Sequence, residues 1–222
     1  RSSAASDVYK RQDLDGLASE AWVEDQEYST DTVAPVLTDL AGYLSVDTST
    51  DAVAFVGANV FVQSGSGYTD DNVTADYGDG SGSIVGLGNL IVGYDENSGD
   101  TKTGSHNLIV GARHTYTSYG AIIGGRNNEI SGPYASVTGG TNHTASGDFA
   151  SIAGGRGHIA SGDRSFAAGG YYNDSTGTYT TVVGGIYSSA SGSYSSAIAA
   201  NAGEAISSYS AVVGGVLSLI HI

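Results

Sequence analysis

Pairs of small apolar residues, each followed by two glycines, recur at a fixed interval in the second half of the chain. The second glycine of each pair, or the alanine that replaces it, stands fifteen residues after the one before, at Gly125, Gly140, Gly155, Gly170, Gly185, Ala200 and Gly215. Fifteen residues are too few for a helix pair or a propeller blade, but they suit one turn of a β-solenoid. The pattern therefore predicts an all-β chain, a parallel β-solenoid with 15-residue coils of two short strands and two corners.

Equivalent positions of successive coils form columns, because each strand stacks on the next at about 4.8 Å. Neighbouring strand residues face opposite sides. The column predicted to fill the interior is Ile122, Val137, Ile152, Ala167, Val182, Ala197 and Val212. The column after it, which includes Ile123, Val183, Ile198 and Val213, would then form an apolar stripe outside. Because so continuous a stripe is unusual on a free surface, we expect these four residues in an interface between copies of the chain.

Two further columns hold small side chains and are expected to line a narrow interior. They are Ile130, Ala145, Ala160, Ser175, Ala190, Ala205 and, in the second column, Ala135, Ala150, Ser165, Thr180, Ser195, Ser210. The glycines are expected at corners, where the backbone needs a positive φ or another strand approaches closely.

The chain before the repeats has a different pattern. Apolar residues at helical spacings, from Val33 to Leu44, predict a short amphipathic helix. The segment from Ala52 to Val62 is apolar on both faces and predicts one or two strands covered on both sides. We therefore expect a helix and strand neck or cap at 13–64, an acidic Gly-rich loop at 65–81, and the repeat domain at 82–216, whose first coils are irregular.

Both ends of the chain resemble a translated sequencing adapter. The codons GAT GTG TAT AAG AGA CAG encode the segment Asp7–Gln12, and their reverse complement encodes Leu217–Ile222. Two unrelated protein segments have no physical reason to be encoded by reverse-complementary DNA, whereas the two inverted adapter ends of a DNA library are reverse complements of each other. We therefore exclude residues 1–12 and 217–222 from fold reasoning and expect the natural part, 13–216, to be a fragment.

The repeat SGDFASIAGGRGHIA, residues 146–160, resembles the head repeat of trimeric autotransporter adhesins, the YadA-like head. Residues that match the family pattern in order are Gly147, Ser151, Ile152, Ala153, Gly154 and Ala160. The family repeat usually has fourteen residues, and this one has an additional residue at the double glycine. The resemblance covers about 82–216. It implies a left-handed parallel β-roll, three chains side by side, surface display and adhesion to host or matrix molecules.

Composition excludes several classes of partner. The net charge is −15 at pH 7, and such an acidic chain is repelled by nucleic acid and by anionic bilayers. The chain has no cysteine, so it has neither a disulfide framework nor a thiolate metal site. No apolar run reaches the roughly 20 residues that span a bilayer. We expect membrane attachment only through flanking regions outside this sequence.

Aromatic residues provide the candidate binding positions. One column, which begins at Tyr119, continues through Tyr134, Phe149, Arg164, Tyr179, Tyr194 and Tyr209. This column is either a structural ladder that stacks coil on coil or a strip that binds a sugar or a protein. Tyr171, Tyr172 and Tyr187 lie outside it, just after the double glycines, and are the preferred ligand-binding candidates. Chance placement of tyrosines on the surface is the alternative for these three.

No metal or catalytic site is predicted. His143 and His158 share a column, but neither a carboxylate nor a third histidine joins them, which favours a solvated pair. The acidic segments 70–71, 76–79 and 95–100 could hold calcium, although no EF-hand spacing is present. The chain has no Ser-His-Asp arrangement, phosphate loop or paired carboxylates, so we expect neither an enzyme nor a cofactor.

These features favour a bacterial adhesin-like structural module, placed on the cell surface at the outer membrane or secreted. Its Tyr-, Ser- and Thr-rich surface would bind an extracellular protein or glycan through many weak contacts, as a homotrimer. One alternative is a segment of a phage or virion tail fibre that binds a receptor. Another is an ice-binding solenoid, which requires a flat threonine array that these columns lack.

Overall fold

The computed structural model describes residues 43–71, 84–96, 99–216 and 219–220, and the chain divides into two compact units, 1–61 and 62–222. In the first unit, β1 (Leu44–Asp47) pairs with β2 (Ala52–Phe55) in an antiparallel hairpin. Both strands are largely exposed in the single chain, so the expectation of a strand covered on both sides is wrong here. The predicted helix lies outside the described residues, except that Leu44 begins β1.

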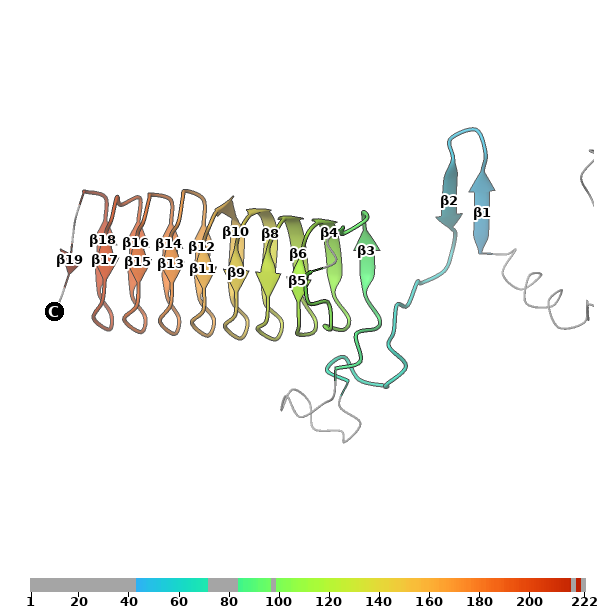
Figure 1. Ribbon diagram of the computed structural model, residues 1–222, viewed down its shortest axis with the longest axis horizontal. Coiled ribbons are helices and arrows are strands. Elements are labelled where there is room, and N and C mark those ends of the chain that lie inside the picture. Colours follow the sequence, from blue (N-terminus) through green and yellow to red (C-terminus); the bar gives the residue numbers. More distant parts are fainter. Residues whose placement is uncertain (1–42, 72–83, 97–98, 217–218, 221–222) are drawn as a thin grey trace, which may run out of the picture. The chain divides into compact units, whose positions relative to one another are not determined.

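The second unit is a parallel β-solenoid, as the fifteen-residue period predicts (Figure 1). Its nine-stranded sheet contains β3 (Leu90–Val92), β4 (Leu108–Ala112), β6 (Ile122–Arg126), β8 (Ser136–Thr141), β10 (Ser151–Arg156), β12 (Phe166–Ala168), β14 (Thr181–Val183), β16 (Ser196–Ile198) and β18 (Ala211–Val213). Its eight-stranded sheet contains β5 (Thr115–Tyr116), β7 (Glu129–Ile130), β9 (Thr144–Ala145), β11 (Ile159–Ala160), β13 (Asp174–Ser175), β15 (Ser189–Ala190), β17 (Glu204–Ala205) and β19 (Leu219–Ile220). From β4 onward each coil contributes one strand to each sheet, and the described residues contain no helix.

The strand register shows how the coil length changes along the roll. Leu90 pairs with Leu108, eighteen residues later, and Leu108 pairs with Ile122, fourteen residues later. From β8 onward the interval is fifteen: Ser136 pairs with Ser151, and Ser151 with Phe166. The change occurs between β6 and β8, next to the double glycines: Ile123 pairs with Val137, fourteen residues later, whereas Arg126 pairs with Thr141, fifteen residues later. The fifteen-residue coil is therefore the fourteen-residue coil with one residue added at that corner.

This change in coil length corrects two column assignments. Ile123, not Ile122, pairs with Val137, and Ile123 is fully buried while Ile122 is exposed. Ile123 therefore belongs to the core, and its predicted place in an oligomer interface is wrong. Tyr119 is likewise buried, at the start of the column predicted to be exposed.

The interior is narrow and filled by three columns of apolar or small side chains. One column contains Ile109, Ile123, Val137, Ile152, Ala167, Val182, Ala197 and Val212, each at most 1% exposed. The two small columns predicted to face inward are also buried, from Ala135 to Ser210 and from Ile130 to Ala205. At the Ser-Gly corner glycine is required because successive coils approach each other closely. A Cβ on Gly162 would lie 1.9 Å from the carbonyl oxygen of Gly177 in the next coil.

A fourth inward column is polar and runs the length of the roll. Its members are His114, Asn128, His143, His158, Asn173 and Ser188, and all six are buried. Each of the first five accepts a hydrogen bond from the backbone N–H of the next member, at 2.9 to 3.3 Å. At this corner, side chains thus supply the acceptors that carbonyl groups supply within the sheets.

The two histidines of this column are not a solvated pair, as the sequence suggested, but a buried stack. The rings of His143 and His158 are 4.9 Å apart and nearly parallel, with 17° between their planes. Because a backbone N–H can only donate, Nδ1 of both rings is the acceptor and lacks a proton. Nε2 of His143 therefore carries the proton and donates it to the carbonyl oxygen of Gly155 at 3.1 Å. The stack is part of the core.

The first coils of the roll are covered by a polar loop at residues 64–71. The N–H of Ser64 donates to Nε2 of His106 at 3.1 Å, and Nδ1 of His106 donates to the carbonyl oxygen of Thr69 at 2.9 Å. Burial raises the pKa of the Asp71 carboxyl, but hydrogen bonds from serines and from a backbone N–H outweigh it and lower the pKa to about 2. Such a cover shields a solenoid end that would otherwise expose unpaired strand edges.

Candidate functional site

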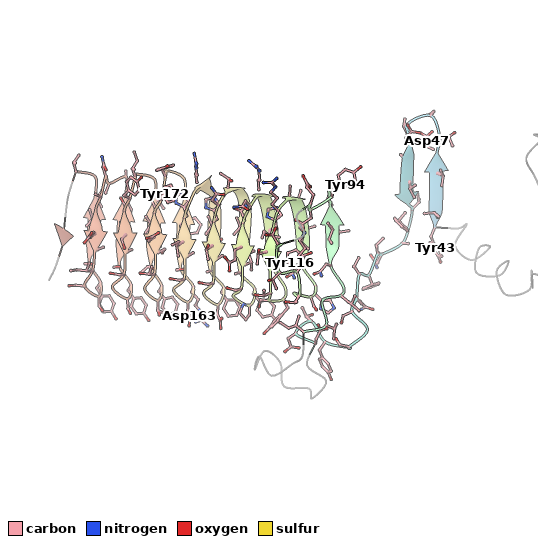
Figure 2. All side chains as sticks on the ribbon, viewed as in Figure 1. Tyr43, Asp47, Tyr94, Tyr116, Asp163 and Tyr172 are labelled. Carbon is pink, nitrogen blue, oxygen red and sulfur yellow. The ribbon has the colours of Figure 1, made fainter. Side chains whose placement is uncertain are left out.

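Two edges, at opposite sides of the roll, join the two sheets in every coil. The aromatic edge consists of Tyr134, Phe149, Arg164, Tyr179, Tyr194 and Tyr209. The arginine edge consists of residues 112–113, 126–127, 141–142, 156–157, 171–172, 186–187 and 201–202. In Figure 2 the label of Tyr172 lies at the arginine edge, and that of Asp163, beside Arg164, lies at the other. Both edges hold residues that the sequence marked as candidates for binding.

All six residues of the aromatic edge are left-handed, with φ between 54° and 61°. This conformation costs a residue with a side chain roughly 1 to 2 kcal/mol. Stacking compensates: Tyr179, Tyr194 and Tyr209 form nearly parallel pairs with centroids 4.9 and 5.1 Å apart. Each such aromatic pair contributes about 0.5 to 1.5 kcal/mol beyond the area it buries.

The ladder continues without interruption through its one charged member. The guanidinium of Arg164 lies 5.2 Å from the ring centroid of Phe149 and 5.5 Å from that of Tyr179, so it stacks between two rings as a cation. Phe149 in turn stacks on Tyr134 at 5.4 Å. The interior members of the ladder thus cover one another's ring faces and present their edges to solvent. This arrangement shows the structural stacking that the sequence allowed and leaves few open faces for a sugar ring.

The arginine edge brings the three preferred tyrosines together. Tyr172 stacks on Tyr187 at 5.8 Å, and Tyr171 meets Tyr172 edge-on at 4.4 Å. Tyr187 is 59% exposed, and Tyr172 is 39% exposed. The cluster is local because Gly157 precedes Tyr172 in its column: a Cβ on Gly157 would lie 2.6 Å from the Tyr172 ring. The Tyr172 ring therefore occupies the space that the Cβ of any residue other than glycine would fill at position 157.

Arginines and amides occupy the other coils of the same edge, and sequence reasoning missed them as site residues. Arg113, Arg126 and Arg156 are exposed, and the guanidinium of Arg156 lies 5.5 Å from the Tyr171 ring centroid. Asn127 donates to Oδ1 of Asn142 at 2.8 Å, which links two successive coils. The signal was present in the sequence, because these residues follow the double glycines just as the tyrosines do. Arg126 and Arg156 keep the fifteen-residue spacing, and only Arg113 departs from it, because its coil has fourteen residues.

The outer faces of the two sheets differ in chemistry. The nine-stranded sheet exposes apolar side chains at Val183, Ile198 and Val213, and also at Leu90, Val92, Val110 and Ile122. Val213 is 74% exposed, whereas Val183 and Ile198 are 36% and 38% exposed. The eight-stranded sheet presents hydroxyl and acidic residues, among them Glu129, Thr144, Asp174, Ser189 and Glu204. Burial raises the pKa of Asp174.

The acidic loops are closed by internal contacts. Lys102 lies 2.9 Å from the Asp95 carboxylate and also donates to its backbone carbonyl, while Asp95 accepts from the His114 N–H at 2.9 Å. Burial and the charge of Asp95 raise the pKa of Tyr116. In the described ranges, no three His, Asp or Glu residues are grouped to hold a metal ion. Residues 76–79, a further candidate for calcium, lie outside these ranges.

Comparisons with known proteins identified no relative of this chain. No protein-family model matches the chain, and neither a curated protein nor a solved structure matches it significantly. Among the residues placed by the structure, none belongs to a helix long and apolar enough to cross a bilayer. The geometry of the edges and faces is therefore the basis for the function.

Proposed function

We propose that this chain is a module of a bacterial adhesin, displayed on the cell surface or secreted. Three copies associate through the outer face of the nine-stranded sheet, and the edges of the roll remain free to contact an extracellular protein or glycan. The likeness of residues 146–160 to the YadA-like head repeat supports this assignment. Repetition along a stiff roll suits adhesion, because many weak contacts made together give a high overall affinity.

The observation that carries the proposal is the difference between the two outer faces. The two sheets belong to the same coils, so the coil repeat alone requires no difference in polarity between their outer faces. One face exposes valine, isoleucine and leucine in β3, β4 and β6 and again in β14, β16 and β18, with mainly small and polar residues in the strands between them, while the other carries mainly carboxylates and hydroxyls beside Ile159. Exposed apolar side chains that recur on three neighbouring strands mark an interaction surface. A second and third copy of the chain are the occupants we assign to it.

Placing charges on this face should prevent association. The wild-type chain is expected to have the mass of three copies in light scattering after size exclusion, and V183K/I198K the mass of one, because two unpaired lysines would be buried in the interface. The control T176K/S191K adds the same charges at exposed positions on the eight-stranded side and should remain trimeric. A wild-type chain that is monomeric at micromolar concentration would contradict the proposal.

A further inference from the structure

We infer that the arginine edge binds an acidic polysaccharide, a chain of sugars that carry carboxylate or sulfate groups. This inference rests on the proposed adhesive function and names the ligand class and the surface that binds it. The ligand runs along the edge, across successive coils, with its anionic groups on Arg113, Arg126 and Arg156 and its sugar rings against the tyrosine cluster.

The first argument is the separation of charge. The chain has a net charge of −15, yet three of the five Lys and Arg residues between 13 and 216 lie on this one edge. None of the residues that define the edge is acidic. In the described part of the chain, Arg113, Arg126 and Arg156 have no carboxylate partner, whereas Lys102 pairs with Asp95. Positive charge concentrated on one edge of an acidic protein attracts an anion to that edge.

The backbone holds the edge in register, so these side chains form two continuous rows. The N–H of Asn127 donates to the carbonyl oxygen of Ala112 at 3.0 Å, and the N–H of Tyr172 donates to that of Arg156 at 2.8 Å. Such bonds link each coil to the one before. Arg126 and Arg156 are two coils apart, roughly 10 Å at the usual strand spacing. Figure 2 shows nitrogen-tipped side chains projecting from the edge over β6 to β10. A linear ligand can therefore meet several guanidinium groups at once.

The chemistry of the rows fits a sugar polymer. Guanidinium groups bind carboxylate and sulfate oxygens through paired hydrogen bonds. The amide of Asn127 lies beside Arg126, and the amide of Asn142 and the hydroxyl of Thr141 lie in the coil between Arg126 and Arg156; these groups can bond to sugar hydroxyls. Farther along, the Tyr187 ring is stacked on Tyr172 on one side only, and a small residue follows it in the column. An exposed aromatic face of this kind packs against the apolar face of a sugar ring.

Nucleic acid fits the same edge less well. A duplex carries one charge for about every 1.7 Å of its axis, a much higher density than three guanidiniums spread over four coils can neutralise. Its width would also bring phosphates close to the acidic outer face of the eight-stranded sheet, where Glu129 and Glu204 are exposed. A single polysaccharide chain with about one charge per sugar avoids both costs.

The test is binding of defined polymers to the full chain. The probes are polygalacturonate and heparin, with fully methyl-esterified polygalacturonate as the uncharged polymer and a DNA duplex as the competing class. We expect at least one acidic polysaccharide to bind about tenfold or more tightly than the ester. R126Q/R156Q should weaken that binding about a hundredfold, since each lost charged hydrogen bond is worth roughly a factor of ten and two are lost. R164Q removes one positive charge from the aromatic edge and should stay within about twofold of the wild type.

Three results would overturn the inference: equal binding of the ester, an equal loss in R164Q, or tighter binding of the duplex than of either polysaccharide. Thermal unfolding of each variant confirms that the compared chains are folded. The mass of the chain in solution separates this inference from the proposed function. A trimer that binds no acidic polysaccharide contradicts the edge site alone, whereas a monomer contradicts the trimeric module.

Discussion

Alanine at Gly162 should lower the free energy of unfolding by about 3 kcal/mol, the upper part of the range for overpacking a rigid interior. The added methyl group would lie 1.9 Å from the carbonyl oxygen of Gly177 and 2.4 Å from its carbonyl carbon. Both are backbone atoms of the next coil, so no side chain can rotate away. Relief requires the coils to separate, which lengthens the hydrogen bond from the N–H of Gly162 to the carbonyl oxygen of Ser175, at 3.3 Å.

Gly139 provides the matched control. It also lies in a coil corner, but a Cβ there would have no atom within 4 Å, and its φ is not in the left-handed region. G139A should therefore be neutral or slightly stabilising, by up to about 1 kcal/mol, because alanine restricts the unfolded chain. Denaturant unfolding of both variants and the wild type, at one protein concentration, measures the difference. Equal stabilities for G162A and G139A would show that the coils are not stacked this closely.

Much of the roll could be predicted because its period is written directly in the sequence. The double glycines gave the coil length, and the inward columns from Ile130 to Ala205 and from Ala135 to Ser210 are buried as expected. The irregular first coils are also as expected, since Leu90 pairs with Leu108, eighteen residues later. These features follow from stacking of equivalent positions, which requires no knowledge of contacts distant in the sequence.

The errors have one physical origin, which is that a constant glycine spacing need not mean a constant strand register. A residue added at the double-glycine corner increases the spacing between glycines to fifteen, but the strand before that corner still pairs at an interval of fourteen. Ile123 rather than Ile122 therefore pairs with Val137. The histidines were misjudged for a different reason. The sequence around His143 does not show that the N–H of His158 lacks a carbonyl acceptor at this corner. The His143 ring lies inside because its Nδ1 accepts that hydrogen bond. Stacking in the aromatic edge could not be predicted either, because it depends on the side-chain rotamers of its aromatic residues and of Arg164.

Acidification should destabilise the chain between about pH 6.5 and pH 4, before most carboxylates are protonated. The pKa of His143 is lowered to about 4, by burial and then by the nearby His158, with the Gly155 carbonyl partly opposing both. Burial also lowers the pKa of His158. Below about pH 6.5 the histidines of the unfolded chain bind protons that those of the folded chain do not bind. The free energy of unfolding therefore decreases as the pH is lowered. For His143 this reaches roughly 3 kcal/mol near pH 4, at about 1.4 kcal/mol per pH unit.

The variant H143N/H158N isolates this effect, because asparagine already accepts the equivalent backbone hydrogen bond in the neighbouring coils. Oδ1 of Asn128 accepts from the N–H of His143 at 2.9 Å, and its Nδ2 donates to the carbonyl oxygen of Gly124 at 2.6 Å. The double variant should fold and lose most of the pH dependence between 6.5 and 4. The wild type should keep it, as measured by denaturant unfolding at several pH values. A double variant with the same slope as the wild type would place the acid sensitivity elsewhere. The Asp71 carboxyl, with its pKa near 2, responds only in more acidic solution, so it does not mimic the histidines.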